Sequence, residues 1–119
     1  MTMIIKLPNI NELYRNFEYP TSFLKIIELN LVDLDLWYIM DDQQVLRRIE
    51  GLQQRYRNRK LIPFARRDDN DDIACFEVGK GEKVQIIHDF ASFGYEQKKV
   101  YNTFWDWFRE AIDEMINFD

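Results

Sequence analysis

The sharpest chemical feature of the sequence is an acidic segment, residues 68–72, which reads DDNDD. Asp68, Asn70 and Asp72 have the i, i+2, i+4 spacing with which calcium-binding loops begin. The rest of such a loop is missing, because its sixth position is isoleucine instead of glycine and its twelfth is glycine instead of glutamate. A solvated turn is therefore the default interpretation, since Asp and Asn side chains readily bond to their own backbone.

Two other groups of residues have the types that catalysis uses. His88 and Asp89 could belong to a hydrolytic triad, but no Ser or Cys stands in a nucleophile elbow, and Ser92 lies in the same segment. A histidine satisfied at a strand end is the simpler interpretation. Glu96 and Lys98 match the acid-x-lysine end of one nuclease signature, a short match that arises often by chance. The sequence therefore predicts no catalytic residues, no metal site and no cofactor.

Cysteine usage and the N-terminal residues predict a compartment. Cys75 is the single cysteine, so neither an intrachain disulfide nor a four-thiolate zinc site can form. It stands in an apolar run and is expected to be a small buried hydrophobe. The first seven residues lack the long apolar region of a signal peptide, and no run reaches the length of a membrane span. We therefore expect a cytoplasmic protein.

Charge is distributed unevenly along the chain. The net charge is −5, yet the segment from Arg47 to Arg67 holds eight basic residues and one acid, Glu50. The remainder holds eight basic and twenty acidic residues. The basic segment spans an amphipathic helix and the start of a strand, where arginines commonly form the solvated face. Since the whole domain is acidic, we expect no nucleic acid partner.

The composition predicts a single folded domain over residues 1–119. Hydrophobic residues make up 46% of the chain and aromatic residues 15%, enough apolar surface to offset the conformational entropy lost on folding. Low contents of glycine (four) and proline (three) argue against a loop-rich or repetitive protein.

Helical periodicity occurs in four segments. We expect a short helix over 9–17, a second from Thr21 or Ser22, a third over 42–57 and a last one from Thr103. The third helix has the clearest apolar stripe, formed by Val45, Ile49, Leu52 and Tyr56. In the last helix the expected apolar face comprises Phe104, Phe108, Ala111, Ile112 and Met115, with Trp105 and Ile116 beside it and Trp107 to one flank.

Strand character occurs at 36–39, 61–65, 73–78 and 83–88. The last two segments flank a short turn with two glycines, which is the usual signal for a hairpin. Residues 66–72 and 89–100 are expected to be loops. Sequential strands with helices outside the group favour an α+β fold with a central, mostly antiparallel sheet flanked by helices. The predicted sheet side of the core comprises Ile62, Phe64, Phe76, Val84 and Ile86.

The order of these segments resembles the SUKH superfamily, the Smi/Knr-type domain. The segments that carry the resemblance are Tyr19-Pro20, the runs 36–39 and 61–65, the acidic loop, the strand 73–78, the strand ending at His88-Asp89, and the last helix from Thr103 to Phe108. The family usually has a glycine-rich turn where residues 67–72 stand here. Because glycine would allow a positive φ, we expect Asn70 to take that role.

The resemblance implies a function as well as a fold. Bacterial members of the superfamily are mainly immunity proteins that neutralise toxins, often nucleases or deaminases, and fungal members are scaffold-like regulators of cell-wall synthesis. The family gives no catalytic residues to carry over. We therefore expect a non-enzymatic binding module, with an immunity protein as the first hypothesis and a regulatory or scaffold domain as the second. A metal-dependent enzyme that uses the aspartates ranks last.

The acidic residues provide the expected partner surface. Enzymes that act on nucleic acid carry basic sites, so an acidic inhibitor gains association rate and complementarity against them. We therefore expect the binding face for a basic toxin domain to include Asp68, Asp69, Asp71 and Asp72 together with Asp41 and Asp42, and to extend to Asp33 and Asp35.

Overall fold

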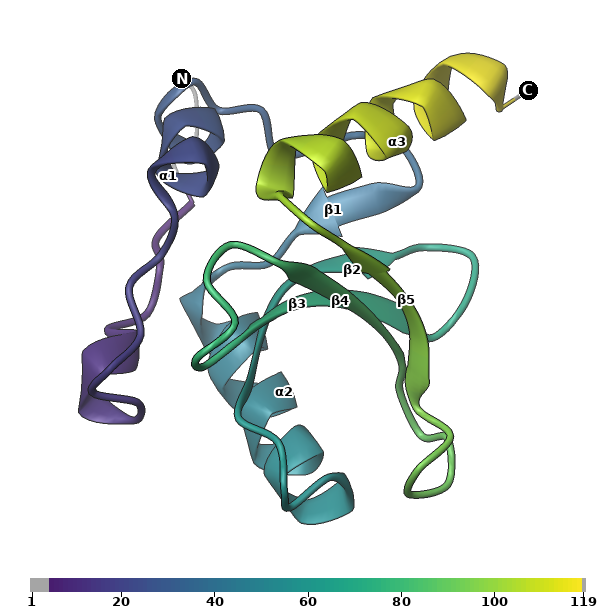
Figure 1. Ribbon diagram of the computed structural model, residues 1–119. Helices are drawn as coiled ribbons and strands as arrows, with labels where there is room; N and C mark the ends of the chain where they lie inside the picture. The colour runs from purple at the N-terminus through teal and green to yellow at the C-terminus, as the bar shows by residue number, and fades with distance from the viewer. Residues whose placement is uncertain (1–4, 119) are drawn as a thin grey trace.

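The computed structural model describes residues 5–118 as three α-helices, one 3-10 turn and a five-stranded sheet (Figure 1). In chain order the elements are η1 (Ile10–Glu12), α1 (Thr21–Glu28), β1 (Trp37–Ile39), α2 (Asp42–Arg55), β2 (Leu61–Arg67), β3 (Asp72–Glu77), β4 (Val84–His88), β5 (Gln97–Tyr101) and α3 (Phe104–Asn117). The strands lie side by side in sequence order, and every neighbouring pair is antiparallel. The predicted α+β fold with a central sheet is confirmed.

Helices cover both faces of the sheet because the central strands are apolar on both sides. Along β3, Ala74 and Phe76 join the larger core cluster, whereas Ile73 and Cys75 join a smaller one. The larger cluster includes residues of α1 and α3 together with Val45 and Ile49 of α2, and the smaller one includes Leu52 near the end of α2. Figure 1 shows α3 lying across one side of the sheet and α2 below the other.

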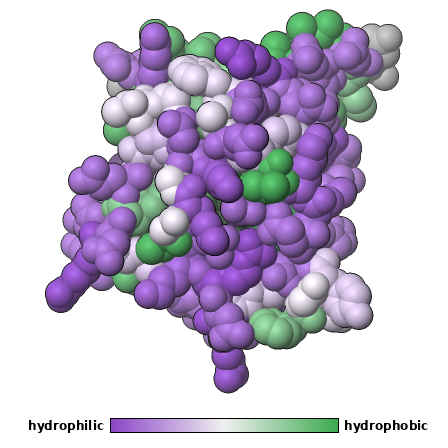
Figure 2. All heavy atoms as spheres, in the orientation of Figure 1, coloured by the Kyte–Doolittle hydropathy of each residue, from purple (hydrophilic) through white to green (hydrophobic). Residues whose placement is uncertain are grey.

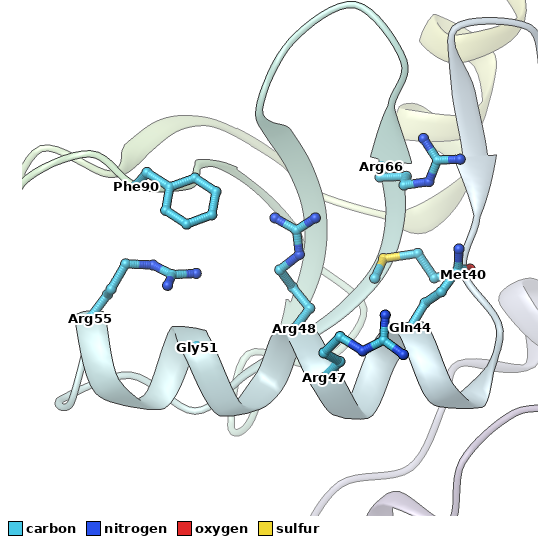
Figure 3. A pocket seen from close by; sticks show the side chains of 8 residues that line it. All are labelled: Met40, Gln44, Arg47, Arg48, Gly51, Arg55, Arg66 and Phe90. Carbon is cyan, nitrogen blue, oxygen red and sulfur yellow. The ribbon is translucent and has the colours of Figure 1, made fainter.

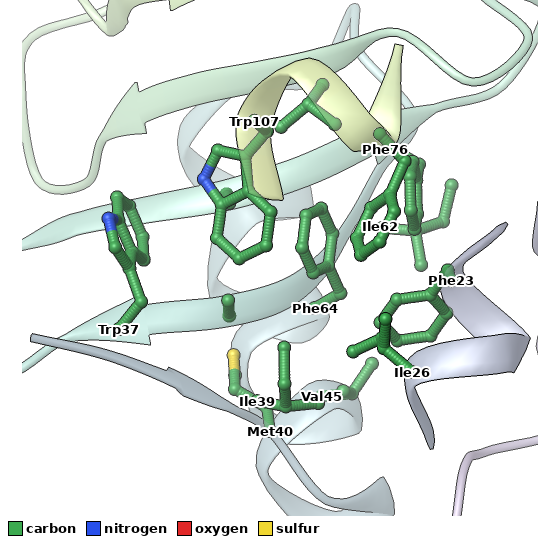
Figure 4. Packing of buried hydrophobic residues seen from close by; sticks show 14 of the residues in the cluster. Phe23, Ile26, Trp37, Ile39, Met40, Val45, Ile62, Phe64, Phe76 and Trp107 are labelled. Atoms are coloured by element: carbon green, nitrogen blue, oxygen red, sulfur yellow. The ribbon is translucent and has the colours of Figure 1, made fainter. Parts of the chain in front are cut away.

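Aromatic rings fill the larger core cluster (Figure 4). Phe64 and Phe76, which are close on β2 and β3, stack with ring centroids 4.5 Å apart. Phe23 of α1 contacts both rings edge-on, and Trp107 of α3 meets Phe64 at 4.9 Å. Such pairs stabilise a core beyond the apolar area that they bury. All of the predicted core residues of α2 and of the sheet are buried, as expected.

The last helix is rotated relative to the prediction. Its fully buried residues are Phe104, Trp107 and Ala111, at steps of three and four. Trp107 is 1% exposed, so its predicted position on the flank was wrong. The large indole packs against Phe64 and Trp37, and this contact buries its apolar area in the core.

Two predicted boundaries differ at the ends of the sheet. β2 extends through Arg66 and Arg67, because these residues pair with Tyr38 and Trp37 of β1. β5 replaces part of the predicted loop 89–100. This strand lies at the edge of the sheet and none of its residues is buried, so its side chains show no apolar alternation.

Two local predictions were wrong. The helix expected over 9–17 is only the 3-10 turn η1, whose N-cap Asn9 makes no side-chain capping bond. Asn70 does not have a positive φ; among described non-glycine residues, that backbone conformation occurs at Asn30, Asp35, Leu36 and Phe90. Instead, the Asn70 side-chain oxygen accepts a hydrogen bond from the backbone N–H of Asp72 at 2.8 Å. A side-chain bond therefore closes the turn without positive φ at that residue.

Candidate functional site

The acidic segment forms a tight loop between β2 and β3. Asp68, Asp69 and Asp71 are exposed, with 64% of the Asp68 side chain and 46% of the Asp69 side chain accessible. The backbone N–H of Asp68 donates to the carbonyl of Leu36 at 2.9 Å, which fixes the loop to the segment before β1. The loop thus presents three carboxylates to solvent on a fixed backbone.

Asp69 is paired within the loop. Arg67 donates from Nε and Nη2 to the two carboxylate oxygens of Asp69 at 2.8 and 3.0 Å. This hydrogen bonding holds the pKa of Asp69 below its usual value. Arg67 also forms an ion pair with Glu114, so the same side chain connects the loop to α3. Asp69 is therefore a partly neutralised acid, unlike Asp71.

Asp72 lies in a different environment from the other loop aspartates. It is the first residue of β3 and is only 3% exposed. One carboxylate oxygen lies 2.9 Å from His88 Nδ1, and the other accepts from the ammonium of Lys98. Its charge is compensated inside the sheet, so the exposed carboxylates of the loop are those of Asp68, Asp69 and Asp71.

Further acids gather near Asp68 at the β1 edge of the sheet. Asp33 and Asp35 precede β1, where the Asp33 side chain accepts from the Asp35 backbone N–H at 3.1 Å. Partial burial raises the pKa of the Tyr38 phenol, and the charges of Asp68, Asp33 and Asp35 raise it further. Asp33 also pairs with Tyr38 through an isolated β-bridge, which places Asp33 beside β1. We call the exposed carboxylates of Asp33, Asp35, Asp68, Asp69 and Asp71 the acidic edge.

Asp41 and Asp42 have a local structural role at the start of α2. The Asp41 side chain accepts from the backbone N–H of Gln44 at 2.9 Å, and the Gln44 side chain accepts from the backbone N–H of Asp41, which completes a capping box. The side chain of Asp42 accepts from the N–H of Gln43. Both carboxylates are partly buried, and their bonds hold the first turn of α2.

A basic groove lies between α2 and the sheet (Figure 3). It has a volume of about 470 Å³ and is lined by Met40, Gln44, Arg47, Arg48, Gly51, Arg55, Arg66 and Phe90. Figure 3 shows Arg47, Arg48 and Arg55 rising from the helix, with Arg66 facing them from β2 and Phe90 closing one end. We call this hollow the arginine groove. None of the lining residues is acidic.

A buried carboxylate fixes the closed end of the arginine groove. Asp89, directly after β4, is fully buried and accepts hydrogen bonds from Arg48 at 2.8 Å and from two nitrogens of Arg55 at 2.8 Å each. The next residue, Phe90, has a φ of 70° and places its ring 4.3 Å from the guanidinium carbon of Arg55. The Asp89 side chain also accepts from the Phe90 N–H, so it holds this strained residue in place.

The segment between β4 and β5, residues 89–96, carries exposed aromatic rings. Phe90 and Phe93 are 63% exposed and Tyr95 is 81% exposed. In Figure 2 pale and green spheres gather at the lower right, where Figure 1 shows the tip of this segment. The segment is held at its base, because the Tyr56 hydroxyl donates to the Ala91 carbonyl at 2.8 Å. Aromatic residues on a fixed loop are typical of protein-binding surfaces.

Within each of the two residue groups that could do chemistry, the members bind different partners. His88 contacts Asp72 and not Asp89, whose carboxylate binds arginines. Glu96 accepts from Arg59, whereas Lys98 contacts Asp72, so the two residues of the nuclease-like match have different partners. Within residues 5–118, no cluster of three or more His, Cys, Asp or Glu side chains could hold a metal ion.

Cys75 has the environment of a structural residue. It is fully buried, and this burial raises the pKa of its thiol well above the usual value. The prediction that it is a small buried hydrophobe is therefore confirmed.

The described helices are too short or too polar to span a membrane.

The sequence model of the SMI1 / KNR4 family (SUKH-1) matches residues 6–110, which is most of the chain and includes the whole sheet. The chain belongs to this family. The SUKH resemblance stated from the segment order is thus confirmed. Neither the curated proteins nor the solved structures give a significant match to this SUKH-1 domain.

The sequence interpretation missed the arginine groove of this SUKH-1 domain. It assigned the arginines of α2 to a solvated face and Asp89 to a loop or a triad. One signal was present: Arg48 and Arg55 are seven residues apart, which places them on one face of a helix, and Gly51 lies between them. The sequence pattern does not show which residue pairs with that face, because Asp89 comes 34 residues after Arg55.

Proposed function

We propose that this SUKH-1 domain is a non-enzymatic immunity protein that binds and neutralises a toxin domain, with a nuclease or deaminase as the class of toxin. Membership of the family over residues 6–110 is the observation that carries the proposal. The arrangement of the described residues supports it, since charged and aromatic groups are presented on fixed loops, whereas neither the His88–Asp89 pair nor the Glu96–Lys98 pair is formed.

The proposed toxin-binding face is the acidic edge. Its carboxylates lie on backbone that is fixed by the Asp68–Leu36 bond and by the Asp33–Asp35 turn, so little order must be gained on binding. Like charges that lie close together repel one another in the free protein, and a cationic partner relieves this repulsion. The face excludes Asp72, which is buried. Asp41 and Asp42, which cap α2, add negative charge beside the face and are not proposed to contact the toxin directly.

The test uses three substitutions in the loop: Asp68→Asn, Asp69→Asn and Asp71→Asn. Exposed charges act mainly on the association rate. The triple variant should therefore associate about tenfold more slowly than wild type, at low salt, with the toxin domain that co-purifies with the chain from its host. The difference should shrink as ionic strength rises. Stopped-flow kinetics at two salt concentrations measure both effects.

A matched control separates local charge from net charge. Glu18, Glu28 and Glu82 are exposed and lie outside the acidic edge, and their replacement by Gln changes the net charge by the same amount. This control should leave the association rate within about twofold of wild type. Equal slowing by the two triple variants would show that the acidic edge is not the binding face. Unchanged kinetics in the loop variant would show that the loop is only a solvated turn.

A further inference from the structure

The arginine groove has a positive charge that the described structure only partly compensates. Asp89 accepts from Arg48 and Arg55, so one buried carboxylate serves two guanidinium groups. Arg66 has a single weak ion pair, with Asp68 at 3.7 Å, and 38% of its side chain is exposed. Arg47 is exposed and takes part in no ion pair within residues 5–118. The four arginines thus share two acids, the buried Asp89 and the exposed Asp68.

The groove is preorganised by an unusual glycine in the middle of α2. A Cβ atom on Gly51 would lie 2.8 Å from Nη2 and 2.9 Å from Nη1 of Arg55. The missing side chain therefore leaves room for the Arg55 guanidinium, which binds Asp89 and contacts the ring of Phe90 from this position. Glycine costs about 1 kcal/mol in a helix interior. The ion pair between Arg55 and Asp89, for which Gly51 leaves room, offsets this cost.

We propose that the arginine groove binds an extended acidic segment of a protein partner, through its carboxylates. Guanidinium groups bind carboxylates in a bidentate geometry. Arg47 and Arg55 are eight residues apart, which is about 12 Å along a helix. An extended chain rises about 3.3 Å per residue, so about four residues span the arginines. The exposed ring of Phe90 gives an apolar contact at one end of the same hollow.

The surroundings of the groove favour a short acidic peptide over nucleic acid. Asp68 contacts Arg66 at one side of the hollow, and Asp41 and Asp42 begin the helix that lines it. The whole chain carries a net charge of −5. A long polyanion that left the groove would meet these carboxylates, whereas a segment of about four residues stays within reach of the arginines. The positive charge is therefore confined to the groove, which suits a short acidic ligand.

The probe is hexaglutamate, titrated into the isotope-labelled full chain at low salt and followed by NMR. The side-chain Nε–Hε signals of Arg47, Arg48 and Arg66 should shift together with the backbone of α2. The double variant Arg47→Gln with Arg66→Gln should weaken binding by about tenfold or more, because it removes two of the charge-assisted contacts with the ligand. A retained chemical shift pattern in the core shows that the variant is folded.

The control variant is Lys80→Gln with Lys83→Gln, which removes two exposed positive charges from the turn between β3 and β4. It changes net charge equally and should leave the affinity for hexaglutamate within about twofold. Equal weakening by the two double variants, or shifts located outside α2 and β2, would overturn the proposal. Tighter binding of a hexathymidylate probe than of hexaglutamate would overturn it in favour of a nucleic acid ligand. No toxin is needed, so this outcome is independent of the proposed immunity role.

Discussion

Arg55 binds Asp89 across 34 residues of chain, with Nε donating to one carboxylate oxygen and Nη2 to the other at 2.8 Å each. This pair connects the last turn of α2 to the end of β4. It also sets the position of Phe90, whose ring covers the same guanidinium. The helix, the arginine groove and the aromatic segment after β4 therefore meet at a single buried carboxylate.

The first prediction removes that charge with Asp89→Asn. Asp89 is fully buried while the Arg48 and Arg55 side chains are each 28% exposed, so the two guanidinium groups lose their partner but keep some water. Removing one partner of a buried ion pair leaves the other charge uncompensated, so we expect the free energy of unfolding to fall by about 2–4 kcal/mol. Urea denaturation measures the loss. Asp71→Asn, at an exposed position, should change it by less than about 0.5 kcal/mol. Equal effects of the two substitutions would contradict the structural role of Asp89.

The second prediction concerns Gly51→Ala. In an ordinary helix interior this change stabilises by about 1 kcal/mol. Here the new Cβ meets the Arg55 guanidinium, so the substitution should lower the free energy of unfolding by about 1 kcal/mol instead. In an Arg55→Ala background the obstacle is absent, and Gly51→Ala should then stabilise by about 1 kcal/mol. A stabilisation of equal size in both backgrounds would show that Gly51 does not make room for Arg55.

The third prediction is a pH dependence at Glu96. Burial alone would raise the pKa of this carboxyl, but the backbone N–H groups of Glu96 and Gly94 and the Arg59 guanidinium outweigh burial and hold the pKa below its usual 4.5. A lowered pKa in the folded state adds stability above pH 4.5, and this stability is lost as the pH falls through the lower folded value. The stability gap between wild type and Glu96→Gln should therefore be widest near neutral pH and close in acid. A gap that stays constant from neutral pH to pH 3 would refute this account of Glu96.

The sequence predicted the fold well where apolar side chains repeat at a fixed period. The stripe Val45, Ile49, Leu52 on α2 and the apolar run of β3 are both buried in the structure, as these patterns predict. The edge strand β5 could not be predicted, since none of its residues is buried and its pairing depends on β4. The position of Trp107 also depended on tertiary structure, because Trp37 and Phe64 come from strands far away in the sequence.

The candidate surfaces were predicted only in part. A run of aspartates indicates a polar turn, and Asp68, Asp69 and Asp71 are exposed there. The burial of Asp72 depends on His88 and Lys98, which approach it from β4 and β5. The same limit applies to the arginine groove, since no local pattern pairs Arg55 with Asp89. Contacts between distant parts of the chain thus decide which charges are compensated and which remain available to a partner.

The central claim is that this SUKH-1 domain neutralises a toxin, and growth protection tests it most directly. The tagged chain is purified from its native host, captured proteins are identified by mass spectrometry, and the captured domain is then expressed in a sensitive strain with and without the chain. We expect one basic toxin domain to be captured, growth arrest when it is expressed alone, and restored growth when the chain is co-expressed. Capture of non-toxic partners alone would favour a regulatory or scaffold role. Growth arrest that the chain does not relieve would contradict the account.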